Sequence, residues 1–140
     1  MPIRRVSPEE AFDLMQNDGW VYLDVRSIPE FEEGHPSGAF NVPLLHRGPG
    51  GGGPNPDFLS VVGRHFPREA RIVVGCHSSS RSEHAAAVLE RAGFTNLAVQ
   101  RAGFGGKRDP LGRGEEGWAR KDLPTSRESE PGRSWEELKE

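Results

Sequence analysis

Residues 72–82 read IVVGCHSSSRS and pass from an apolar run through a polar loop to the start of an alanine-rich stretch. The apolar run at 72–74 has the composition of a buried strand, and the alanine-rich stretch from Ser82 to Ala92 has the spacing of a helix. Cys76 therefore opens a turn that leads from a strand into a helix. Turns of this kind point backbone N–H groups at anions, because the first N–H groups of a helix have no partner within it.

Strands and helices alternate on both sides of this turn. The stretch Ser7-Pro8-Glu9-Glu10 has the form of a capping box with proline at the first helical position. The predicted elements are a helix over 8–16, a strand over 20–25, a helical turn over 29–33, a strand over 39–42, a helix over 57–66, a strand over 71–75, a helix over 82–92 and a strand over 97–99. This order predicts an α/β sandwich with a mainly parallel sheet.

Composition narrows the range of partners. The 140 residues are enough for one compact core, and the net charge of −3 with scattered arginines argues against nucleic acid as a partner. No run of about eighteen apolar residues exists, which argues against a membrane partner. The one cysteine cannot form an internal disulfide, and no signal-peptide core precedes the first helix, so we expect a free thiol in a cytoplasmic protein.

The loop after the central strand has the chemistry of an anion cradle. Four small or polar residues separate Cys76 from Arg81. Ser78, Ser79 and Ser80 leave the backbone amides accessible, while Arg81 and the following helix add positive charge. A thiolate, which is the nucleophilic form of cysteine, suits such a loop.

A cysteine-protease site fits this loop poorly. His77 is adjacent to Cys76 in the sequence, so its ring cannot easily reach back to act as a general base, and no Asn or Asp orienter is evident. We interpret His77 as a polar residue at the rim of the loop. The five histidines and one cysteine show no metal-ligand spacing, so we expect no metal.

Several short motifs, taken in order, carry a resemblance to the rhodanese family. They are Leu23-Asp24-Val25-Arg26, Glu30-Phe31, Gly34-His35, Gly38-Ala39, Asn41-Val42-Pro43, Cys76-x4-Arg81-Ser82 and Trp118-x4-Leu123-Pro124. Together with residues 55–59, they bring the chain closest to the single-domain thiosulfate sulfurtransferases of plants and bacteria. The resemblance covers residues 7–125.

The resemblance implies a fold and a division of the chain. It implies a three-layer sandwich in which helices flank a mainly parallel central sheet. We expect residues 5–125 to form this domain and residues 126–140 to form a linker with a short terminal helix. The stretch Ser134-Trp135-Glu136-Glu137 has the capping-box form that would begin that helix.

The resemblance also implies a reaction and its residues. Cys76 would be the nucleophile and persulfide carrier, and Arg81 would orient the loop and the donor as a second catalytic residue. His77, Ser78, Ser79, Ser80 and Ser82 would bind the substrate, while Asp24 and Arg26 would brace the loop. The expected partners are a small sulfur-containing anion and a cyanide or thiol acceptor, with a protein sulfur acceptor as a further candidate. No cofactor is implied.

The chain departs from the family pattern at three places. Ser79 stands where most relatives have glycine, which would cost about 1 kcal/mol if the backbone needed a positive φ there. Residues 107–117 are an insertion between Gly105-Gly106 and Trp118, and Asp122 replaces a usual glycine before Leu123-Pro124.

The segment 46–56 is rich in glycine and proline. From its composition we expect it to be a mobile loop.

Two other functions remain open at this point. A non-catalytic or sulfur-delivery module would keep the fold and bind a protein partner. The segments 46–56 and 107–117 would suit this role as well as the enzymatic one. Phosphatase or arsenate-reductase chemistry is disfavoured, because the related phosphatases have one more residue between the cysteine and the arginine.

Overall fold

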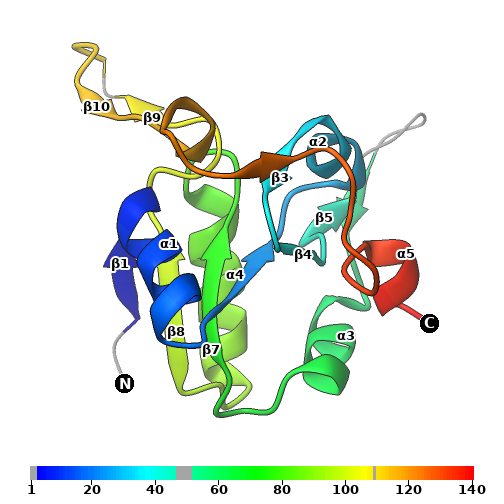
Figure 1. Ribbon diagram of the computed structural model, residues 1–140. Coiled ribbons are helices and arrows are strands. Elements are labelled where there is room, and N and C mark those ends of the chain that lie inside the picture. Colours follow the sequence, from blue (N-terminus) through cyan, green and yellow to red (C-terminus); the bar gives the residue numbers. More distant parts are fainter. Residues whose placement is uncertain (1–2, 47–51, 109) are drawn as a thin grey trace.

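The computed structural model of the chain describes residues 3–46, 52–108 and 110–140. Its centre is a five-stranded sheet in the order β1-β8-β7-β2-β4, and every pairing within that sheet is parallel (Figure 1). The strands are β1 (Arg4–Val6), β8 (Asn96–Gln100), β7 (Arg71–Gly75), β2 (Val21–Asp24) and β4 (Phe40–Asn41). The predicted mainly parallel α/β fold is confirmed.

Helices cover both faces of the sheet and give the predicted three layers. They are α1 (Pro8–Asn17), α2 (Ile28–Glu33), α3 (Phe58–His65), α4 (Ser80–Arg91) and α5 (Trp135–Leu138), with a 3-10 turn η1 at Trp118–Arg120. Alternate residues of β7 divide the core: Val73 packs with α1 and Trp118, whereas Ile72 and Val74 pack with α3, α4 and α5. This alternation follows from the two-residue period of a strand.

Local sequence signals explain where two helices begin. The Ser7 hydroxyl accepts from the Glu10 amide at 3.0 Å, and the Glu10 carboxylate accepts from the Ser7 amide at 2.8 Å, so the predicted capping box opens α1. Helix α4 begins at Ser80, two residues before the predicted start at Ser82. The difference brings the first turn of the helix closer to Cys76.

The sequence did not predict β1 at the edge of the sheet. Two of its three residues are exposed arginines, so the segment lacks the apolar run that marks a buried strand. It pairs with β8 in the register Arg4–Ala98 to Val6–Gln100, and only Val6 is buried. Backbone hydrogen bonding therefore holds this strand in place.

The chain beyond the last strand of the sheet packs back onto the body. Strand β11 (Thr125–Ser126) pairs with β3 (His35–Pro36), and α5 adds Trp135 and Leu138 to the core beside α3. The Arg64 side chain of α3 donates to the carbonyl of Leu138 at 3.1 Å. The predicted domain boundary after residue 125 stays a prediction, although residues beyond it contribute to the core.

Two hairpins lie outside the central sheet. Strands β5 (Leu45–His46) and β6 (Gly53–Pro54) pair at the two ends of the glycine-rich segment. Residues 47–51 of this segment lie outside the described part of the chain, so its predicted mobility stays a prediction. Strands β9 (Lys107–Arg108) and β10 (Gly114–Glu115) form the insertion, which projects from the body as an arm (Figure 1). Within the described ranges, none of the helices has the length and apolar character to span a bilayer.

Trp135→Ala tests whether α5 is part of the folding unit. Because the Trp135 side chain is buried in the main core cluster, its removal should lower the free energy of unfolding by about 3 kcal/mol. Urea denaturation measures the change. It is monitored by far-UV circular dichroism of the backbone rather than by tryptophan fluorescence, because the variant lacks a tryptophan. Glu136→Ala, at an exposed position of the same helix, should leave stability within about 0.5 kcal/mol of wild type. Equal stability of the two variants would show that α5 does not contribute to the fold.

Candidate active site

Cys76 lies at the carboxyl end of the central strand of the sheet. It follows β7 directly and is 2% exposed, and the loop that it begins leads into α4. The carbonyl of Cys76 accepts from the amide of Phe104 at 2.8 Å, and the carbonyl of His77 accepts from the amide of Gly105 at 2.8 Å. The cysteine loop is therefore fixed on one side by the segment that follows β8.

The sulfur of Cys76 is held by Ser82 in the first turn of α4. The Ser82 amide donates to Sγ at 3.4 Å, and the thiol in turn donates to the Ser82 hydroxyl at 3.4 Å. That hydroxyl donates to the carbonyl of Ser79 at 2.9 Å, and Ser82 is fully buried. The serine thus offers the sulfur an N–H donor from a fixed position.

The remaining amides of the cysteine loop are open. Within residues 3–46, 52–108 and 110–140, the N–H groups of residues 77–81 donate to no protein acceptor. His77 and Ser80 are exposed, and Ser78 and Ser79 are half-buried, so the loop borders solvent. Unpaired amides at a helix start attract an anion, as does the helix dipole.

Ser79 causes none of the backbone strain considered for a residue that replaces glycine. Its φ is −165°, which is extended backbone open to any residue, and no non-glycine residue in the described chain has a positive φ. The positions that require glycine are instead in the segment that packs against the cysteine loop. A Cβ on Gly103 would stand 2.3 Å from the carbonyl oxygen of His77, and one on Gly105 would stand 2.1 Å from the His77 ring.

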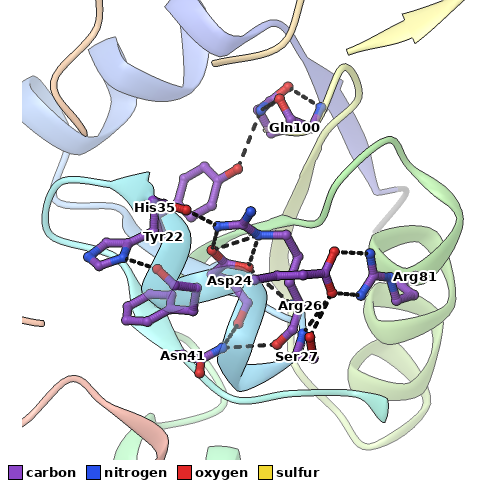
Figure 2. A network of polar contacts seen from close by, with 12 residues as sticks. Tyr22, Asp24, Arg26, Ser27, His35, Asn41, Arg81 and Gln100 are labelled. Atoms are coloured by element: carbon purple, nitrogen blue, oxygen red, sulfur yellow. Dashed lines mark hydrogen bonds and ion pairs between the residues drawn. The ribbon is translucent and has the colours of Figure 1, made fainter. Parts of the chain in front are cut away.

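Arg81 is paired with a residue from another element. Its Nη1 and Nη2 donate to the two carboxylate oxygens of Glu30 at 2.6 and 3.0 Å, and Glu30 comes from α2 (Figure 2). The same carboxylate accepts from the hydroxyl of Ser27 at 2.8 Å and from its amide at 3.2 Å. Burial alone would raise the pKa of Glu30, but the bonds from Arg81 and Ser27 outweigh it and lower the pKa to about 2.

Sequence reasoning missed the role of Glu30, which it used only as part of a family motif. The Ser27-x-x-Glu30 spacing is a capping box, and this was the local signal available. The contact with Arg81 joins residues 51 positions apart, so no local pattern could have revealed it.

Asp24 and Arg26 form a buried brace beside this pair. Arg26 Nε donates to Asp24 Oδ1 at 3.0 Å, and Nη2 donates to Asp24 Oδ2 at 2.8 Å and to the carbonyl of Gly34 at 2.6 Å. The Arg26 guanidinium also lies 4.5 Å from the centre of the Phe104 ring. Figure 2 shows the two ion pairs close together, with Asn41 donating to the carbonyls of Asp24 and Arg26 at 3.1 and 3.0 Å. The brace joins the ends of β2 and α2 to the segment that supports the cysteine loop.

Residues 7–106 match the rhodanese-like domain. The chain is 44% identical over 120 residues to thiosulfate sulfurtransferase 16, chloroplastic, of Arabidopsis thaliana, a match that covers 86% of this chain and 90% of the relative. The chain belongs to the rhodanese family.

Two further comparisons agree with this membership. The thiosulfate sulfurtransferase GlpE of Glaesserella parasuis serovar 5 is 26% identical over 119 residues, with coverage of 85% of this chain and 89% of the relative. The crystal structure of Rv0390 from M. tuberculosis superposes with a TM-score of 0.74 at 27% identity and covers 91% of this chain and 100% of that one. The Arabidopsis relative is named chloroplastic, and the cytoplasmic location expected for this rhodanese stays a prediction.

The structure brings the sequence-predicted site residues of this rhodanese into two groups. Cys76 and residues 77–80 form the loop that leads to Ser82, whose amide and hydroxyl contact the sulfur. Asp24, Arg26 and Arg81 form the ion pairs Asp24–Arg26 and Glu30–Arg81 beside one another. In the part of the chain that the structure describes, no cluster of three or more His, Cys, Asp or Glu side chains could hold a metal ion.

The lowered pKa of Glu30 makes a prediction about acid stability. A carboxyl whose pKa falls from 4.5 to about 2 on folding stabilises the fold fully above pH 4.5, and this contribution disappears as the pH falls towards 2. After allowance for solvent screening, Glu30→Gln should cost about 1–2 kcal/mol at pH 7, and the cost should shrink by pH 3. Urea denaturation at both pH values measures it. A cost that is the same at pH 7 and pH 3, or one that Glu33→Gln reproduces, would contradict the assignment.

Proposed function

We propose that this rhodanese is a sulfurtransferase that moves a sulfane sulfur from thiosulfate or a similar donor to cyanide or a thiol. The observation that carries the proposal is the position of the Cys76 sulfur, which faces the amide of Ser82 at 3.4 Å at the base of a loop of open amides. Relatives named thiosulfate sulfurtransferase, at 44% and 26% identity, support the choice of donor.

The proposed reaction has two displacement steps. The Cys76 thiolate attacks the outer sulfur of thiosulfate, so that a bond forms from Sγ to that sulfur. The S–S bond of thiosulfate breaks, and sulfite leaves with the bonding electrons. Cyanide or a thiolate then attacks the outer sulfur of the persulfide, and the Cys76 thiolate is released. Charge and electrons balance in each step without an outside oxidant or reductant.

The loop suits the persulfide anion formed between these steps. An outer sulfur bonded to buried Cys76 would extend towards the half-buried and exposed residues 77–80, where the unpaired amides lie. Fixed N–H donors stabilise such a charge without reorganising during the reaction. Four residues between Cys76 and Arg81 make a loop shorter than that of the related phosphatases, which favours sulfur over a phosphate ester.

A sulfur-delivery module with a protein partner is the second candidate. The β9–β10 arm favours it, because the arm projects from the body directly after the segment that bonds to the cysteine loop (Figure 1). Its Leu111 is 76% exposed. The arm begins two residues after Gly105, which bonds to the cysteine loop, so it offers a surface that a protein partner would use and that cyanide or thiosulfate would not need.

The mass of the protein after thiosulfate treatment separates the candidates. The wild-type chain should gain about 32 Da, one sulfur atom, and excess cyanide should remove it. Cys76→Ser should show no gain, and Ser60→Ala, at an exposed position of α3 outside the cysteine loop, should still gain the sulfur. A wild-type protein that gains no mass from thiosulfate would contradict the proposed enzyme and favour the delivery module.

Arg81→Ala should lower thiosulfate:cyanide turnover at least about ten-fold. The substitution removes a positive charge beside the sulfur and leaves the Glu30 carboxylate without its cation, which repels an anionic donor. Thiocyanate release measures the rate. Arg91→Ala, at the exposed far end of the same helix, is the control and should keep wild-type turnover. Unchanged kinetics in Arg81→Ala would refute the role of Arg81.

A further inference from the structure

The ion pair between Glu30 and Arg81 joins α2 to the first turn of α4. Its carboxylate receives four hydrogen bonds, two from Ser27 and two from Arg81. Ser27 is buried, and the side chains of Arg81 and Glu30 are 14% and 23% exposed, so the pair is largely shielded from water. Arg81 is thereby held by a fixed partner on α2.

The pair also places a negative charge directly against the guanidinium of Arg81. Arg81 directly precedes Ser82, whose amide lies 3.4 Å from the sulfur, so the guanidinium comes from the same first turn of α4. The pKa of Arg81 is raised, mainly by the hydrogen bonds that it donates to Glu30. Both of its terminal nitrogens donate to Glu30. A guanidinium that donates two hydrogen bonds to one carboxylate forms an ion pair with almost no net charge, so the pair attracts other anions only weakly.

The second ion pair beside the loop is balanced in the same way. Asp24 and Arg26 are both buried and neutralise one another. Each of the two pairs, Glu30–Arg81 and Asp24–Arg26, contains one acid and one arginine, so the side-chain charges of these four residues sum to zero. The attraction for an anion then comes from the open amides and the helix dipole rather than from Arg81.

We propose that Glu30 is a positioning residue that neutralises Arg81 and thereby limits the attraction of the sulfur site for strongly charged anions. The Glu30 carboxylate binds Arg81 and so orders the first turn of α4, which places the Ser82 amide against the sulfur. The negative charge of the same carboxylate offsets the positive charge of Arg81. The consequence for substrates rests on the sulfurtransferase proposed above. With Arg81 paired, the site favours donors and acceptors of low charge, such as alkyl persulfides and thiols, more strongly than the same site would with an unpaired arginine.

Paired alkylating reagents test the charge without requiring sulfur transfer. Iodoacetate and iodoacetamide attack the same thiolate and are similar in size, but only iodoacetate is an anion. The ratio of their rate constants with Cys76 therefore reports the local charge, and changes in thiolate fraction cancel. Glu30→Gln should raise the iodoacetate-to-iodoacetamide ratio about three- to ten-fold. Glu33→Gln removes the same charge from an exposed position of α2 and should leave the ratio within about two-fold of wild type.

Two further variants keep the test decisive if Glu30→Gln folds poorly. Glu30→Asp retains the charge on a shorter side chain, so its ratio should stay close to wild type even if both rates change. Arg81→Gln leaves the Glu30 carboxylate unpaired, so its ratio should fall about three-fold or more. An unchanged ratio in a folded Glu30→Gln protein, or a ratio that does not fall in Arg81→Gln, would overturn the proposal and leave Glu30 with a purely structural role.

The experiment separates this inference from the proposed reaction. Failure of the proposed function would appear as the absence of a sulfur adduct after thiosulfate treatment. Failure of the inference would appear in the alkylation ratios, which need only a reactive Cys76. If thiosulfate turnover is present, Glu30→Gln should also lower the KM for thiosulfate more than it changes kcat, whereas a structural defect would reduce kcat.

Discussion

The amide of Ser82 faces the sulfur of Cys76 at 3.4 Å, and the rest of the site is arranged around this contact. It can form only because β7 ends one residue before the cysteine and α4 begins four residues after it. That short connection turns the first N–H groups of the helix inward, towards the end of the central strand. In the described chain the amides of residues 77–81 stay without protein acceptors, so they remain available to a bound anion.

Three supports hold the cysteine loop in this geometry. The segment 103–105 bonds to the carbonyls of Cys76 and His77, and its glycines allow the close approach. The Glu30–Arg81 pair ties the first turn of α4 to α2, and the buried Asp24–Arg26 pair ties the end of β2 to the same neighbourhood. Because these contacts come from different parts of the chain, the loop depends on the complete fold.

The sequence predicted those elements that have strong local signals. The apolar run at 71–75 matches β7, and the Ser7 capping box marks the start of α1. The Cys76-x4-Arg81 spacing predicted the candidate site, which lies between the end of β7 and the first turn of α4. Strand β1 was missed because two of its three residues are arginines, and the pairing of Arg81 with Glu30 was missed because tertiary packing alone brings α2 and α4 together. The insertion 107–117 was recognised, but its glycines and charges gave no sign of a β-hairpin.

A crystal structure of the protein after reaction with thiosulfate tests the central claim most directly. The account predicts a second sulfur bonded to Cys76 Sγ and within hydrogen-bond distance of the amides of residues 77–82, with Arg81 still paired to Glu30. An added sulfur that points away from these amides, or a loop that turns its carbonyl groups towards it, would contradict the account.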